Sequence, residues 1–351
     1  MAKRAFALAA SVGLLMTVAL PVSARNVNGM NTYAVHLLQS NVPGLAAATD
    51  TDLKNGWGIT RSPTSPWWVS AEGTDKSVLY NGSTGAKLAL VVTVDGGPTG
   101  TVFNGSTDFK VDAGTGLLPS RFLFATEDGE IYGWNGVGTD SIEAAETDDA
   151  IYLGLAIGSV GDANYLYAAN FPQARVDVFD KNFDLQDWDG AFVDPGIPDG
   201  YAPFGIQNIA GEIFIAYAKQ NEDGDEEVAG DGLGFVSAFG TDGSFHGRVA
   251  SHGELNAPWG LAWAPDNFGK FSGDLLVGNF GDGRISAYHR GEDGWEARGL
   301  LKGTNHRPIE IDGLWGIGFG NGAAAGPTNT LFFAAGPNDE EDGLFGSITA
   351  P

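Results

Sequence analysis

Short apolar stretches alternate with turns rich in Gly, Asp and Asn along almost the whole chain, a pattern typical of many short antiparallel strands. One element recurs in which three apolar residues precede a small one. Its six copies lie at residues 67–70, 122–125, 165–168, 213–216, 275–278 and 331–334. A regular recurrence of this kind indicates a repeat fold.

A second element, an apolar residue followed by Gly and then Ile or Leu, precedes most copies of the first. It starts at Trp57, Leu153, Phe204, Trp259 and Trp315, and the copy in the second unit is degenerate, near residues 101–103. The five intervals from Gly58 to Gly316 average about 52 residues. A unit of that length with three or four strands is one propeller blade, which must stack on its neighbours to bury both faces. We therefore predict an all-β, six-bladed β-propeller, because a two-sheet sandwich gives no reason for six equal periods.

The two ends of the chain complement each other. The sixth unit runs out after its third strand, at residues 343–348, while residues 33–38 form a strand pattern with no unit of its own. Pairing the N-terminal strand with the last blade would close the ring and remove its exposed edges. We predict this closure within a single domain at residues 25–351, and we expect trimming of either end to open it.

The first 24 residues have the pattern of a secretory signal peptide. Lys3 and Arg4 precede an apolar run of 16 residues, which ends in a Val-Ser-Ala sequence at residues 22–24. A membrane helix is the alternative, but the run is shorter than the ~20 residues that span a bilayer. We expect cleavage after Ala24 and a secreted or periplasmic protein.

Charge and cysteine content restrict the classes of partner and of chemistry that we expect. The chain has 44 Asp and Glu residues against 19 Lys and Arg residues, a net charge of −25, and it has no cysteine. Phosphate binding needs clusters of Lys and Arg, and the sequence has none. We expect no nucleic-acid partner, no membrane association after signal cleavage, no disulfide or thiolate chemistry, and a monomer.

The order of these strand elements resembles that of NHL and TolB-like six-bladed propellers. More closely, residues 255–261 (Leu-Asn-Ala-Pro-Trp-Gly-Leu), 276–283 (Leu-Val-Gly-Asn-Phe-Gly-Asp-Gly) and 343–347 (Gly-Leu-Phe-Gly-Ser) are similar to a family of exported, conserved hypothetical bacterial proteins. The resemblance covers essentially the whole chain after the signal peptide. It implies the propeller fold and assigns no activity.

The mouth of the central channel is where chemistry is expected, because the loops entering the inner strands and leaving the second strands open on one face. Oxygen-bearing candidates for a Ca²⁺ site in these loops are Asn55, Glu72, Asn170, Asn256 and Asp312. Further ligand-binding candidates at the mouth are Trp57, Glu127, Phe204, Trp259, Asn279 and Trp315. The aromatic residues would stack on a sugar or another planar ligand, or would instead be core between the blades. The polar residues would bind metal or would simply be solvated.

An acidic insertion interrupts the fourth unit. Residues 216 and 239 are 23 positions apart, against 9 to 11 in the other units, and the excess contains Asp223, Asp225, Glu226 and Glu227. Such a loop over the channel mouth would be a lid or a partner contact, or a solvated acidic tip. The spacing of an EF-hand is absent. Residues 338–342 repeat the acidic theme on the same face.

Two functions follow as alternatives. The first is a binding or scaffold propeller whose channel-mouth face takes a small ligand, a glycan or a protein. The second is a hydrolase similar to calcium-dependent lactonases, with Ca²⁺ in the central channel. The five histidines are scattered without zinc-site spacing, and no Gly-x-Ser-x-Gly motif or phosphate-binding Gly loop is present. The catalytic residues, if any, are not identified by the sequence.

Overall fold

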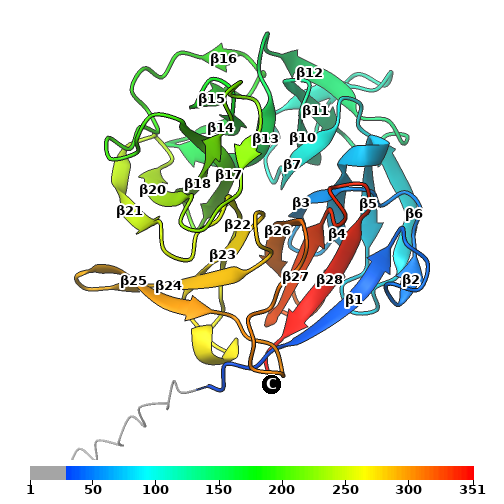
Figure 1. Cartoon of the computed structure of the whole chain (residues 1–351). Coiled ribbons are helices and arrows are strands. Elements are labelled where there is room, and N and C mark those ends of the chain that lie inside the picture. The colour runs from blue at the N-terminus through cyan, green and yellow to red at the C-terminus, as the bar shows by residue number, and fades with distance from the viewer. Residues whose placement is uncertain (1–28) are drawn as a thin grey trace, which may run out of the picture.

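The computed structural model describes residues 29–351, so the expected signal peptide lies outside the described residues. Six antiparallel sheets surround a central axis (Figure 1), which confirms the six-bladed propeller. In blades 1 to 5 the strands follow one another in sequence from the axis to the rim, whereas in blade 6 the N-terminal strand takes the outer position. Two short 3-10 helices are present in the described chain, η1 (Glu72–Thr74) and η2 (Gly269–Phe271).

Blades 1 to 3 follow one another along the chain, each with four strands in order from the axis outward. Blade 1 contains β3 (Gly56–Thr60), β4 (Trp67–Ala71), β5 (Lys76–Tyr80) and β6 (Lys87–Thr93). Blade 2 contains β7 (Pro98–Phe103), β10 (Phe122–Thr126), β11 (Glu130–Trp134) and β12 (Ile142–Glu146). Blade 3 contains β13 (Tyr152–Val160), β14 (Ala163–Asn170), β15 (Arg175–Phe179) and β16 (Leu185–Gln186). A small hairpin, β8 (Lys110–Asp112) and β9 (Leu117–Pro119), is added to blade 2.

Blades 4 to 6 complete the ring. Blade 4 contains β17 (Tyr201–Ile209), β18 (Glu212–Gln220), β20 (Phe235–Gly240) and β21 (Phe245–Ser251), and β19 (Glu227–Val228) pairs with the end of β18. Blade 5 contains β22 (Pro258–Trp263), β23 (Leu275–Asn279), β24 (Ile285–Gly291) and β25 (Gly294–Leu300). Blade 6 contains β26 (Leu314–Phe319), β27 (Thr330–Ala335), β28 (Leu344–Thr349) and β1 (Ala34–Ser40), with β2 (Ala48–Thr49) beyond β1.

The predicted closure is confirmed. Strand β1 pairs antiparallel with β28, from Ala34 opposite Thr349 to Ser40 opposite Leu344. The first and last strands of the described chain therefore lie side by side in Figure 1. Blade 6 is complete only because the N-terminal strand supplies its fourth position, so the ring is closed without covalent crosslinks.

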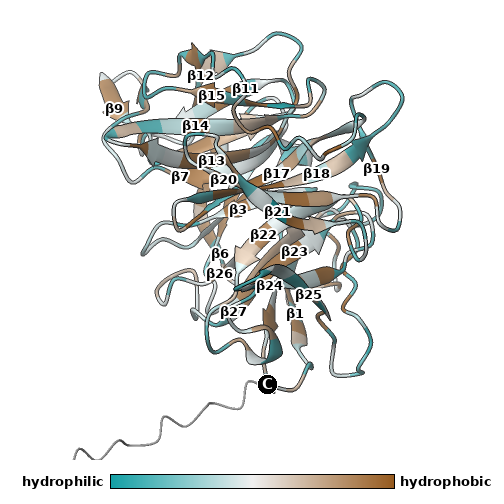
Figure 2. Ribbon diagram, turned by 90° about the vertical axis from the view of Figure 1, so that its left-hand side faces the viewer, coloured by the Kyte–Doolittle hydropathy of each residue, from teal (hydrophilic) through white to brown (hydrophobic). Residues whose placement is uncertain are grey.

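The recurring apolar triplet is explained by burial of both faces of each sheet. Successive side chains of a strand point to opposite faces. In β4, Trp67 and Val69 pack against blade 6, whereas Trp68 packs against blade 2. Six apolar clusters fill the six interfaces between neighbouring blades, and a seventh surrounds the axis. In Figure 2 the hydrophobic residues accordingly concentrate on the strands.

A ring of six glycines lets the inner strands approach one another closely. A Cβ atom on Gly205 would lie 2.0 Å from the carbonyl oxygen of Trp259 on the next inner strand, too close for any side chain. The same kind of contact with the next blade occurs at Gly58, Gly100, Gly154, Gly260 and Gly316. Gly100 is thus the second copy of the Gly element, and the degenerate motif predicted near residues 101–103 starts two residues earlier.

In the described part of the chain, no helix is long and apolar enough to cross a membrane.

Candidate functional site at the channel mouths

The inner strands β3, β7, β13, β17, β22 and β26 line a channel with two mouths. We call the end where these strands begin, near Asn55 and Asp312, the upper mouth. The end where they finish, near Thr60 and Phe319, is the lower mouth. Of the predicted ligand sets, Trp57, Glu127 and Asp312 line the cavity at the upper mouth, together with residues of the acidic insertion.

An aromatic plug closes the channel below the upper mouth. Trp315 has no exposed surface and stacks between Trp57 and Phe280, with ring centroids 3.8 and 4.1 Å away. Phe204 is also fully buried, and the Trp259 indole N–H donates to the Leu153 carbonyl at 2.7 Å. Phe204 and Trp315 are therefore core residues, the second of the two roles considered for the aromatic residues. Trp57 forms the floor of a cavity.

That cavity, about 510 Å³ in volume, occupies the upper mouth and is strongly acidic. Its walls come from all six blades, and its carboxylates are Glu127, Asp225, Glu226, Glu227, Asp312, Asp339 and Glu340. Its lining contains no Lys, Arg or His residue. Throughout residues 29–351, none of these seven carboxylates forms an ion pair with a basic side chain.

Two of the acidic residues next to this cavity are in direct contact. Glu72 and Glu127 follow the second strands of blades 1 and 2 and occupy equivalent positions. A Cβ atom placed on Gly97 would lie 3.0 Å from Glu127 Oε2 and 3.4 Å from Glu72 Oε1, so the two carboxyl groups flank this glycine. Burial, the charges of Glu72 and Glu340, and a hydrogen bond with Glu72 raise the pKa of Glu127 to about 8, so Glu127 keeps its proton near neutral pH.

Asn55 connects this pair to blade 6. Its amide nitrogen donates to Glu72 Oε2 at 2.9 Å and to Glu340 Oε2 at 3.0 Å. Its amide oxygen accepts the indole N–H of Trp315 at 3.0 Å, which fixes the orientation of the amide because an indole nitrogen only donates. Burial, then the charges of Glu227 and Glu72, raise the pKa of Glu340 to about 7.

Three consecutive residues with strained backbone conformations place Glu340 at the cavity. Asn338, Asp339 and Glu340 have successive φ angles of 62°, 51° and 65°, a conformation that non-glycine residues rarely adopt. The carboxylate of Asp312 accepts the backbone N–H of Asn338 at 2.9 Å and so holds this turn. Strain of this kind persists where the surrounding structure enforces it, often at functional sites.

The acidic insertion folds as a short hairpin over the cavity. Lys219 and Gln220 of β18 pair with Val228 and Glu227 of β19. Asp225, Glu226 and Glu227 line the cavity, whereas Asp223 does not. Burial raises the pKa of Glu227. The insertion thus contributes carboxylates to the same site as Glu127 and Glu340.

The proposed Ca²⁺ ligands do not converge. The Asn256 amide oxygen accepts the Gly230 N–H at 2.7 Å, and Asn170 donates to the buried Asp177 at 2.7 Å rather than facing the cavity. Asn279 likewise uses both ends of its amide, on the Asn256 N–H and the Glu254 carbonyl. In the described residues no three His, Asp or Glu side chains are grouped to hold one metal ion. The amide oxygens of Asn55 and Asn256 accept hydrogen bonds from the protein itself, and Asn170 pairs with Asp177, so the five predicted ligands do not form a calcium site.

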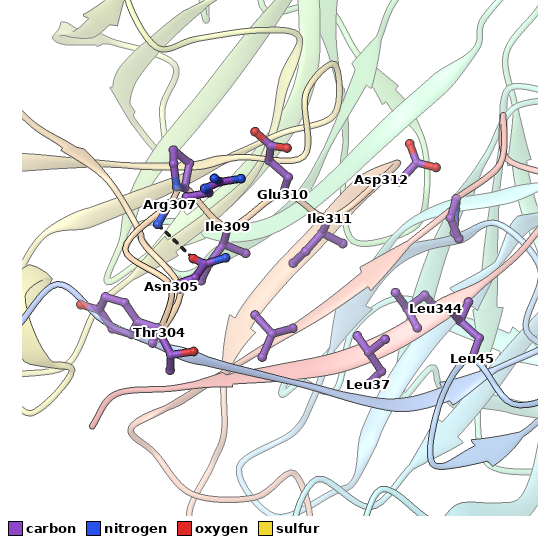
Figure 3. Close-up of a pocket in the computed structure, with 15 residues that line it drawn as sticks. Leu37, Leu45, Thr304, Asn305, Arg307, Ile309, Glu310, Ile311, Asp312 and Leu344 are labelled. Atoms are coloured by element: carbon purple, nitrogen blue, oxygen red, sulfur yellow. Dashed lines mark hydrogen bonds between the residues drawn. The ribbon is translucent and has the colours of Figure 1, made fainter.

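A larger groove, about 910 Å³, lies at the rim between blade 6 and the loop preceding β26 (Figure 3). Leu37, Leu344 and Ile311 line its apolar part. Of its charged groups, Glu310 accepts from Arg284 at 2.7 Å and Asp312 accepts from the Asn338 N–H, whereas the Arg307 guanidinium forms no ion pair within residues 29–351. Its position and lining therefore give it no chemistry comparable to the upper mouth.

Comparisons with known proteins place the chain in a family. No family model matches it. Two proteins of Acanthamoeba polyphaga mimivirus, each named as uncharacterized, are both 32% identical to it. The alignments cover 91% and 90% of this chain and 80% and 86% of the viral proteins. Both relatives are viral, whereas the sequence motifs suggested a bacterial family.

Solved structures support the fold. The soluble aldose sugar dehydrogenase of Escherichia coli matches with a TM-score of 0.53 at 13% identity, over 91% of this chain and all of that one. A streptogramin B lyase matches with a TM-score of 0.50 at 12% identity, over 91% and 98%. At these identities the likeness concerns the propeller alone. The chain therefore belongs to the family of propeller proteins that includes the two mimivirus relatives.

Proposed function

We propose that this protein is an exported binding protein whose upper mouth takes a small organic cation bearing ammonium or guanidinium groups. The observation that carries the proposal is the set of cavity carboxylates without a basic partner, in which Glu127 and Glu340 are half-buried and have raised pKa values. A bound cation would favour the charged form of these carboxyl groups, so we assign the missing positive charge to a ligand.

The cavity fits an organic cation better than a bare metal ion. Its volume of about 510 Å³ is that of a small-molecule site, and Trp57 and Phe280 give it an aromatic floor for cation–π contact. The Trp57 indole N–H is buried and has no hydrogen-bond partner among the described residues. A ligand that carries an acceptor atom beside its cationic group would satisfy this donor.

The calcium-dependent hydrolase is the competing proposal. Among its predicted ligands, it needs the Asn55 and Asn256 amides to turn their oxygens into the cavity. That would break the bonds to Trp315 and Gly230 described above. The two proposals therefore differ in the cation that binds with higher affinity.

Calorimetric titration with spermidine and, separately, with CaCl₂ tests the proposal at low ionic strength, where screening is weak. We expect spermidine to bind more tightly. Changing both Glu127 and Glu340 to Gln should weaken spermidine binding at least tenfold, or about 1.4 kcal/mol. The matched control is Glu292→Gln with Asp293→Asn, which removes two exposed carboxylates from the blade 5 hairpin. An equal loss in both variants would show non-specific attraction to the acidic surface, and tighter, saturable Ca²⁺ binding would favour the hydrolase.

Export is the second part of the proposal and has its own test. N-terminal sequencing of the protein recovered outside the cytoplasm of an expression host should begin at Arg25. Retention of Lys3 and Arg4 in a cell-associated protein would contradict it.

A further inference from the structure

The lower mouth forms a second cavity, about 350 Å³, with a composition opposite to that of the upper mouth. Its wall is a ring of aliphatic side chains from four inner strands, Ile59, Ile209, Leu261 and Ile317. Trp263, which is 36% exposed, stands at its edge. This cavity contains no Asp or Glu residue in its lining.

One cation, Arg61, lies in this apolar setting. Its Nε donates to the Phe319 carbonyl at 2.6 Å, and its guanidinium carbon lies 5.7 Å from the centre of the Trp67 ring. Trp67 is itself held by a 2.9 Å bond from its indole N–H to the Ala325 carbonyl. The guanidinium is therefore fixed at one edge, and its two terminal amino groups remain for another partner.

That partner is not supplied by the described chain. Arg61 forms no ion pair anywhere in residues 29–351, although acidic residues outnumber Lys and Arg by 44 to 19. Burial lowers its pKa, with no nearby carboxylate to offset the effect. A partly buried guanidinium without a counterion is costly, and a carboxylate that bonds to both terminal amino groups would relieve that cost.

The neighbouring polar side chains do not pair with the Arg61 guanidinium. The Asn208 amide is used on both sides, donating to the Ile157 carbonyl and accepting from the Gly211 N–H. Gln207 is exposed at the rim. The cavity thus presents one directed cation, an aliphatic wall and an exposed indole.

We infer that the lower mouth is a second binding site, for a small organic anion whose carboxylate pairs with Arg61 and whose apolar body packs on Ile59, Leu261 and Trp263. This site is independent of the proposed upper-mouth function, because the buried aromatic plug separates the two cavities. The ligand class is an apolar monocarboxylate.

Hexanoate, hexanol and acetate are suitable probes, with binding followed by tryptophan fluorescence and by calorimetry. Hexanoate should bind saturably, at least tenfold more tightly than hexanol, which lacks the charge, or acetate, which lacks the apolar body. Arg61→Gln should reduce hexanoate affinity at least tenfold and leave hexanol unchanged. Arg298→Gln, a change on the outer strand of blade 5, is the matched control and should have no effect. Melting curves establish that each variant is folded.

Trp263→Ala keeps the test decisive if Arg61→Gln does not fold. This partly exposed side chain lines the apolar wall, and its other aromatic contact, with Trp295, lies outside the cavity lining, so its loss should weaken hexanoate and hexanol equally. Hexanoate binding that equals hexanol binding, that persists in Arg61→Gln, or that is absent at millimolar concentrations would each overturn the inference. Spermidine binding at the upper mouth is measured separately, so failure of one site leaves the other unaffected.

Discussion

The upper and lower mouths are the two ends of one channel, yet their chemistry is opposite. Seven carboxylates line the upper mouth without a basic residue, and a single guanidinium occupies the lower mouth without an acidic one. Because the inner strands are near-equivalent repeats, this contrast comes from the residues just outside them. The upper carboxylates lie on entering and leaving loops, while the lower wall is made by the ends of the strands.

In this repeat fold, the contacts that stabilise the ring are separate from the residues that would bind ligands. The glycine ring and the interblade clusters form the same contacts in every blade, whereas each mouth depends on individual loops. A change in the ring should affect both mouths together, and a change at one mouth should leave the other intact. The predictions below test that separation.

The largest effect is expected at the ring itself. In Gly205→Ala the new Cβ would lie 2.0 Å from the Trp259 carbonyl oxygen, so the backbones of two blades must move apart. We expect a loss of about 3 kcal/mol in the free energy of unfolding, measured by denaturant titration. In the control, Gly291→Ala, the nearest atom would be 3.5 Å away, and stability should hardly change. Equal stability of the two variants would contradict close packing at the axis.

At the upper mouth, Glu127→Gln should stabilise the ligand-free protein at alkaline pH. The pKa of Glu127 is about 8 in the folded chain, above its ordinary value of 4.5. Between these values the folded state retains a proton that the unfolded state has lost, so wild-type stability falls as pH rises from 4.5 to 8. Gln stays neutral throughout, and we expect a gain of about 2 kcal/mol at pH ~9 that disappears at pH ~4. Thermal melts across this range measure it, and a variant less stable at high pH would contradict the raised pKa.

At the lower mouth, Arg61→Gln should have the opposite sign. The substitution removes the bond to the Phe319 carbonyl and the contact with Trp67, at a cost of about 1 kcal/mol that does not vary with pH between about 5 and 9. Denaturant titration at two pH values measures the loss of stability and shows whether it is independent of pH. A stabilised Arg61→Gln variant would mean that the guanidinium is strained rather than held.

The smallest effect is expected from Trp57→Phe, which removes an indole N–H that has no partner in the described chain. The smaller ring loses packing area on Trp315, whose centroid lies 3.8 Å away, but no hydrogen bond is lost, so packing alone sets the cost in stability. Trp259→Phe is the control: it removes the bond to the Leu153 carbonyl and should cost about 1 kcal/mol more. If the two substitutions cost the same, the Trp57 N–H has a partner.

Sequence reasoning predicts the blades and the closing strand because both depend on patterns that repeat. It misses Gly100 because Thr99 and Thr101 replace the apolar residues that flank the glycine in the other copies. It also places Asn170 and Asn279 at the channel, whereas the next residues, Phe171 and Phe280, belong to the axial cluster.

Strand register contributes to that error. The pairing of inner and second strands shifts once in every blade, for example between residues 152 and 155 in blade 3 and between residues 258 and 260 in blade 5. Such an irregularity changes which side chains face the axis, and residue spacing alone does not reveal it. Glu340 is similar, because its place in the cavity depends on three successive left-handed residues.

A crystal structure of the protein grown with spermidine would show directly whether the upper mouth binds an organic cation. We predict an ammonium group within hydrogen-bond distance of the Glu127 and Glu340 carboxylates, with the chain of the ligand over Trp57. An empty upper mouth, with spermidine bound only to exposed carboxylates on the outer strands, would contradict it.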